Sequence, residues 1–146
     1  KYDYDNLLYV VAGEVVARVS GLSWTDFVES RIMRPLGMMR SAGVYQTIKD
    51  RKNIAMPHSV LNSQLNQFEP YAKNDPSLGA AGGIYASVGD LSKWMMLHLN
   101  DGRYGERNQH QLVSKENHQE MLRPHTFIGF NQKPDQPDKI HFNAYG

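Results

Sequence analysis

Two polar side chains near the start of the sequence are of types suited to proton transfer and substrate binding. Tyr4 and Asn6 stand two residues apart, directly before an apolar helical pattern. A phenol ordinarily titrates near pH ~10, so it shuttles protons at neutral pH only where cations stabilise the phenolate. An amide has two donor hydrogens and an acceptor oxygen, so it can bond an ammonium and a carbonyl together. Considered alone, such a tyrosine is usually a packing residue, and such an asparagine is usually a helix N-cap.

The other candidate groups form no recognisable cofactor or metal site. The glycine-rich segment 79–83 lacks the lysine and serine of a phosphate loop and completes no dinucleotide fingerprint, so we interpret it as a tight turn. The chain has no cysteine, which excludes disulfides and thiolate ligands. The histidines lack the i, i+4 pairing of a helical zinc site; they are His58, His98, His110, His118, His125 and His141. We therefore expect no metal and no cofactor.

The composition is that of one ordinary domain with balanced charge. The 146 residues include 16 basic and 15 acidic side chains, for a formal net charge of +1. This balance favours neither nucleic acid nor an anionic membrane surface as a partner. The longest apolar stretches, such as residues 7–11, fall far short of the roughly 20 residues that span a bilayer. We expect no membrane span in this segment.

The first predicted element is a helix over residues 6–20. Asp5 or Asn6 can cap its start, and Gly21 stands where a left-handed residue would end it. The apolar residues recur at intervals of three and four, which places them on one helical face. They are Leu8, Ala12, Val15 and Val19.

Further helical patterns begin at Ser23 and Ser87, each followed three residues later by an aspartate, as in a capping box. The first of these helices must end near Pro35 and the other near Gly102, and a shorter helix is expected over residues 114–122. We predict one buried core from the large apolar residues of these helices: Trp24, Phe27, Trp94 and Leu99.

The rest of the chain has weaker patterns. Between residues 37 and 80 the periodicity gives way to short apolar pieces that suit strands or turns. Residues 131–139 are polar and contain proline, which predicts a loop. A strand is expected to begin at Ala144.

Three stretches together resemble the serine β-lactamases of the class C type and the related carboxypeptidases and esterases. The motif Tyr4-Asp5-Asn6 is similar to the family's Tyr-x-Asn, with aspartate in a position commonly occupied by serine or alanine. Residues 13–38 resemble the family's helical hairpin, which ends in Pro-Leu-Gly-Met. Residues 81–91 are similar to the glycine-rich turn and helix that follow. These stretches occur in the family's order, and from the first to the last they span about two-thirds of the chain.

The sequence departs from the family pattern in two ways. It contains no Ser-x-x-Lys, the motif of the family's nucleophile, and no Lys-Thr-Gly or His-x-Gly triplet. In the family the first motif precedes the tyrosine and the triplet follows a later strand. We therefore expect residues 1–146 to be the helical part of a β-lactamase-like domain, truncated at both ends and inactive by itself.

The resemblance implies a fold and roles for individual residues. The fold would be mainly α, as the helical subdomain of the α/β fold of β-lactamases and penicillin-binding proteins. Tyr4 would act as general acid and base, and Asn6 would orient substrate and lysine. Gly82 matches a position where class C β-lactamases tend to carry an aromatic wall of the pocket, so its pocket would be more open. This favours a peptidase or esterase.

The implied function is cleavage of an amide or ester bond through an acyl-serine intermediate. The substrate would be a β-lactam, a D-alanyl peptide or a small ester, and these cannot be distinguished from the residues. The chain's partner would be the remainder of its own catalytic domain, and the location would be periplasmic or extracellular. The alternative is a non-catalytic helical binding or sensor module that kept the scaffold without the nucleophile.

Overall fold

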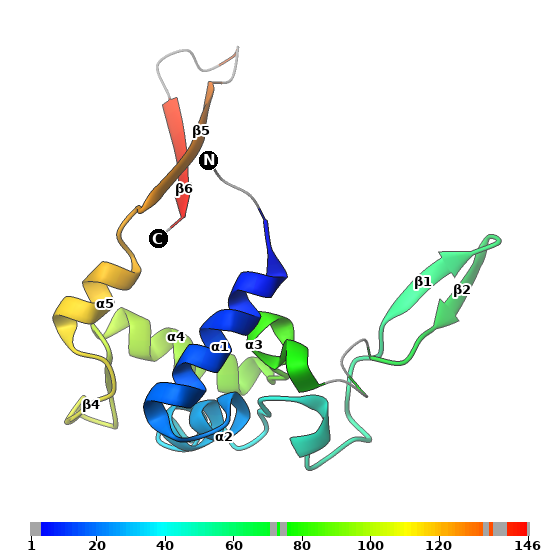
Figure 1. Cartoon of the computed structure of the whole chain (residues 1–146), viewed down its shortest axis with the longest axis horizontal. Helices are drawn as coiled ribbons and strands as arrows, with labels where there is room; N and C mark the ends of the chain where they lie inside the picture. Colours follow the sequence, from blue (N-terminus) through cyan, green and yellow to red (C-terminus); the bar gives the residue numbers. More distant parts are fainter. Residues whose placement is uncertain (1–3, 71–72, 74–75, 133–134, 136–139, 146) are drawn as a thin grey trace. The chain divides into compact units, whose positions relative to one another are not determined.

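The chain folds into two compact units that contain more helix than strand. The computed structural model describes residues 4–70, 73, 76–132, 135 and 140–145. The first unit is Asp5–Met95, and the second joins Lys1–Tyr4 to Met96–Gly146. The helices are α1 (Asn6–Ser20), α2 (Trp24–Val28), α3 (Gly79–Gly82), α4 (Val88–Leu99) and α5 (Lys115–Met121) (Figure 1). The helix-rich character expected from the sequence is present.

Helix α1 begins and ends where the sequence predicted. Asp5 is the N-cap, and its carboxylate accepts a hydrogen bond from the Leu7 amide at 2.7 Å. At the other end Gly21 has φ 72°, and its amide bonds the Ala17 carbonyl at 2.9 Å. A left-handed residue in this place lets the chain leave the helix while bonding a terminal carbonyl, which favours glycine.

The side of α1 that is buried is not the face that carries its periodic apolar residues. Gly13 is the buried residue of this helix, and a Cβ atom added to it would lie only 2.6 Å from the Ala80 Cβ. Helix α3 therefore packs directly on the α1 backbone (Figure 1). Three residues of the predicted face are 65%, 54% and 84% exposed: Leu8, Val15 and Val19. The shared helical face of these residues is therefore not the side on which α3 packs, because α3 approaches α1 at Gly13.

The second helix continues in an unusual form. Ser23 caps α2 through a bond from the Asp26 amide at 3.1 Å, as predicted. The chain then runs through the π-helical segment η1 (Glu29–Met33) and turns at the predicted proline. Residues from α2 to the following loop form the buried core of the first unit; they are Val28, Met33, Leu36, Met38, Ala42 and Val44.

The predicted aromatic core is only partly correct. Trp24, Phe27 and Trp94 are half-buried, whereas Leu99 is 76% exposed. On α4 the fully buried leucine is Leu97, at 1% exposure. Residues two apart on a helix project about 200° apart, so burial of one excludes burial of the other on the same side. The sequence pattern had selected the wrong face.

The strands form antiparallel hairpins. Strands β1 (His58–Leu61) and β2 (Gln64–Gln67) pair, as do β3 (Arg103–Tyr104) and β4 (His110–Gln111), and β5 (Thr126–Gln132) and β6 (Ile140–Tyr145). Short 3-10 segments are η2 (Tyr45–Thr47) and η3 (Pro76–Leu78).

Two strand predictions near the end of the chain need correction. Strand β5 includes residues 131 and 132, which pair with residues 141 and 140, so the predicted loop begins later. Strand β6 begins at Ile140, before Ala144. In both cases hairpin pairing extends the strands into a polar segment. Residues 133–134 and 136–139 of the predicted loop lie outside the described residues.

Among the described residues, no single helix is both long enough and apolar enough to cross a membrane. One bent pair, α1 with the helix Trp24–Met33, meets the length and composition criteria together, with a 71° bend between its members.

Candidate active site

The tyrosine motif stands at the mouth of α1. Tyr4 immediately precedes the N-cap residue Asp5 and is 71% exposed. Asn6 is the first helical residue, and it is exposed as well. Both side chains that the resemblance singles out are therefore exposed.

The cap assignment decides what the Asn6 amide can do. The sequence left open whether Asp5 or Asn6 caps the helix, and the structure assigns the cap to Asp5. Within the part of the chain that is described, the Asn6 side chain forms no hydrogen bond. Its donors and acceptor therefore remain available for a substrate or a lysine.

Gly82 is the last residue of α3 and has open space around it. A Cβ atom added to Gly82 would meet nothing within 4 Å. At the next residue, Gly83, an added Cβ would lie 2.7 Å from the Gly79 Cα and 3.2 Å from the Gly43 carbonyl oxygen. Of these two adjacent glycines, only Gly82 therefore has room for a side chain.

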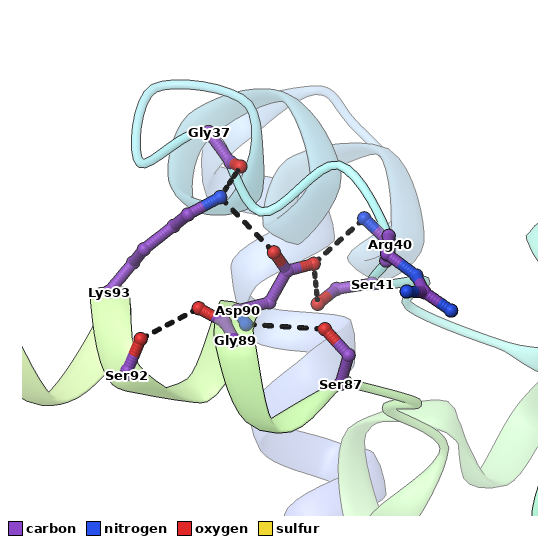
Figure 2. Close-up of polar contacts among 8 residues, drawn as sticks. All are labelled: Gly37, Arg40, Ser41, Ser87, Gly89, Asp90, Ser92 and Lys93. Atoms are coloured by element: carbon purple, nitrogen blue, oxygen red, sulfur yellow. Dashed lines mark hydrogen bonds and ion pairs between the residues drawn. The ribbon is translucent and has the colours of Figure 1, made fainter.

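A buried carboxylate that the sequence analysis missed lies at the start of α4 (Figure 2). Asp90 is 4% exposed, and one of its oxygens accepts from the Arg40 amide at 2.8 Å and the Ser41 hydroxyl at 2.9 Å. Its other oxygen pairs with Lys93 at 3.2 Å, and Lys93 also donates to the Gly37 carbonyl. The carboxylate therefore joins the loop after the first two helices to α4.

The environment of Asp90 favours its charged form. Burial opposes ionisation, but the hydrogen bonds from Ser41, the Arg40 amide and Lys93 outweigh that effect and lower the pKa of Asp90. The predicted cap is also present, since the Asp90 amide bonds the Ser87 hydroxyl at 3.2 Å. The spacing Ser87-x-x-Asp90 was interpreted only as a cap, and the carboxylate's long-range partners are 50 and 49 residues away in the chain.

A cavity of about 400 Å³ adjoins this cluster. Arg40, Ser41 and Ser87 belong to both, and the remaining walls come from residues near Ile48, Ile54 and Tyr85. Tyr85 is fixed by a reciprocal pair of backbone hydrogen bonds with Ala42, each 2.9 Å long. Burial raises the pKa of the Tyr85 phenol, which keeps it uncharged.

Two of the scattered histidines meet in the second unit. His98 Nδ1 and His118 Nε2 are 3.0 Å apart, and His118 is 2% exposed. Burial, and then the neighbouring His118, lower the pKa of His98. Among the described residues no group of three or more His, Cys, Asp or Glu side chains could hold a metal ion. The twenty-residue separation explains why the sequence spacing did not reveal this pair.

Comparison with known proteins identifies the family. The family model described as Beta-lactamase matches residues 1–138. The chain therefore belongs to the β-lactamase family, as the three sequence motifs indicated.

The relatives are hydrolases and a penicillin-binding-protein homologue. The chain is 32% identical over 98 residues to unguisins hydrolase ungD' of Aspergillus campestris, which covers 64% of this chain and 18% of that protein. It is 29% identical over 106 residues to the D-alanyl-D-alanine-carboxypeptidase/endopeptidase AmpH of Escherichia coli K12. That match covers 73% of this chain and 25% of AmpH.

A solved structure has the same fold. The octameric penicillin-binding protein homologue from Pyrococcus abyssi matches with a TM-score of 0.70 and 27% identity, over 88% of this chain and 26% of that one. The chain thus has the fold of this family and spans about a fifth to a quarter of the length of the proteins it matches.

Proposed function

We propose that the intact protein is a serine hydrolase that cleaves an amide or ester bond, with Tyr4 as its general acid and base. The observation that carries this proposal is the Tyr4-Asp5-Asn6 motif at the capped start of α1, in a chain of the β-lactamase family. In this proposal residues 1–146 form the helical part of the catalytic domain. The nucleophilic serine and its lysine are supplied from outside them.

The reaction proceeds through an acyl-serine intermediate. The serine oxygen bonds the acyl carbon while its proton passes to the Tyr4 phenolate. Tyr4 then returns that proton to the leaving nitrogen or oxygen as the scissile bond breaks. Water deacylates the serine by the same transfers in reverse. The free Asn6 amide orients the substrate carbonyl and the lysine ammonium during both steps.

The proposed substrate class follows from Gly82 and from the relatives. An open wall at Gly82 suits a bulkier substrate than a walled pocket does. AmpH is named a D-alanyl-D-alanine carboxypeptidase and endopeptidase, which makes a D-alanyl peptide the first substrate to test, before a small ester and a β-lactam. We propose a periplasmic or extracellular location, as the family resemblance implies.

The decisive experiment is Tyr4→Phe in the intact protein. This change removes only the hydroxyl, so we expect turnover to fall by roughly 10²–10⁴-fold with little change in melting temperature. Activity is measured with a D-alanyl dipeptide, a p-nitrophenyl ester and a chromogenic cephalosporin.

The matched control is Tyr9→Phe, which removes the same hydroxyl from an exposed tyrosine within α1. It should retain the parent's turnover. If Tyr4→Phe also stays within about threefold of the parent, a barrier difference of roughly 0.7 kcal/mol, Tyr4 is not the proton shuttle. An intact protein that hydrolyses none of the three substrates would instead favour the non-catalytic binding module.

A further inference from the structure

The cavity beside Asp90 has the size and lining of a small-molecule site. Its volume of about 400 Å³ lies within the usual range for ligand pockets, roughly 300–1,000 Å³. The lining contains none of Tyr4, Asn6 and Gly82, so the proposed function leaves it unexplained.

Two cationic side chains of the lining have no carboxylate partner. Neither Arg40 nor Lys49 forms an ion pair with any residue that the structure describes. The Arg40 backbone amide is bound to Asp90, but its guanidinium extends away from that carboxylate (Figure 2). The acidic residue of the lining is Asp50, whose Oδ1 accepts the Lys52 amide at 3.0 Å. The lining therefore has two positive charges and one negative charge.

The rest of the lining is mainly apolar, and the walls at residues 40–42 and at Tyr85 are anchored by hydrogen bonds. Ile48 and Ile54 line the cavity together with Tyr85, whose ring makes an edge contact with Tyr45 at 6.0 Å between centroids. The wall made by residues 40 and 41 is anchored through the buried Asp90. A ligand would thus find a preformed apolar surface beside unpaired cations, which reduces the ordering cost of binding.

We propose that this cavity binds a small organic carboxylate with an apolar body. The carboxylate would pair with Arg40 and Lys49, because a guanidinium matches carboxylate geometry in a bidentate manner. The body would lie against Ile48, Ile54 and the Tyr85 ring. An apolar compound of the same shape without the charge would lose the ion pairs and bind more weakly.

Benzoate and benzamide test this proposal, because they share a ring and differ in charge. The intact protein is labelled at isoleucine δ1 methyl groups and titrated by NMR. Benzoate should move the Ile48 and Ile54 signals saturably, with a Kd on the order of 1 mM for so small a ligand. Ile128, which does not line the cavity, should stay unmoved. Benzamide should bind about fivefold more weakly, the factor that one exposed ion pair supplies.

Variants then assign the charge preference. Arg40→Gln and Lys49→Gln should each reduce the preference for benzoate over benzamide, and the double variant should abolish it. The control Arg34→Gln removes an exposed arginine that does not line the cavity and should leave the titration unchanged. Equal binding of the two probes, or no saturation of either methyl signal up to about 50 mM benzoate, would overturn the proposal.

Discussion

At the first turn of α1, neighbouring polar residues have separate tasks. Asp5 satisfies the Leu7 amide, so the helix start does not need the Asn6 side chain. A cap is worth about 1 kcal/mol, and that contribution belongs to Asp5 here. Changes at Asn6 therefore alter its amide without uncapping the helix, and the amide can serve the proposed chemistry.

Adjacent glycines at the end of α3 should respond in opposite ways to alanine. Gly82→Ala adds a methyl group to empty space and reduces the freedom of the unfolded chain, so it should be neutral or stabilise by about 0.5 kcal/mol. Gly83→Ala would push a Cβ to 2.7 Å from backbone, which should cost at least about 1–3 kcal/mol. Urea unfolding of both variants measures the difference. A loss at Gly82 as large as that at Gly83 would show that its surroundings are filled.

Helix α4 contains one buried and one exposed leucine, and comparing their alanine variants tests which face of the helix is buried. Leu97→Ala should cost about 2.5–5 kcal/mol because this side chain is 1% exposed. Leu99→Ala, on the same helix and 76% exposed, should change the free energy of unfolding by no more than about 0.5 kcal/mol. Chemical denaturation of the 146-residue chain measures both. Equal losses would mean that α4 is rotated from the face described here.

The loop and helix that Asp90 joins are held by a charge rather than by apolar contact alone. Its hydrogen bonds reach the backbone of Arg40 and the hydroxyl of Ser41, and Lys93 bridges the carboxylate and the Gly37 carbonyl. Removing one partner of a buried, bonded charge is costly because the others remain desolvated. This cluster therefore couples residues 37–41 to the start of α4.

For the whole molecule, this cluster should make stability depend on pH. Folding lowers the pKa of Asp90, so the stabilisation is complete above the ordinary aspartate value near ~4 and is lost as the pH falls through the lower folded value. Asp90→Asn should cost about 3 kcal/mol at neutral pH, and its unfolding curve should approach the parent's in acid. Urea unfolding between neutral pH and about pH 3 measures this convergence.

The control for that experiment is Asp101→Asn. Asp101 is exposed and pairs with Lys115 at 3.4 Å, and asparagine tolerates its φ of 51°. An exposed pair contributes little, so this variant should follow the parent at every pH. A constant gap between Asp90→Asn and the parent over the acid range would show that the Asp90 charge does not contribute to the pH dependence.

The local features of this protein were determined by its sequence alone. The Asp5 or Asn6 start of α1, its Gly21 end, and the serine caps at Ser23 and Ser87 depend on residues within four positions of one another. The family was equally accessible, because its motifs are contiguous runs such as residues 4–6 and 13–38. The helix ends and the family can both be predicted from residues that are close together in the sequence.

Only the tertiary structure decided which faces are buried and which distant groups meet. Leu8, Val15 and Val19 have helical periodicity but stay exposed, because α3 approaches α1 at Gly13 instead. The sequence spacing indicates only a capping role for Asp90, whereas in the folded chain its carboxylate bonds residues 40 and 41. In the same way, His98 contacts His118, which lies 20 residues further along the chain. Sequence periodicity shows that one face of a helix is apolar. Whether that face is buried depends on which other segment packs against it, and this is determined only by the packing of the folded chain.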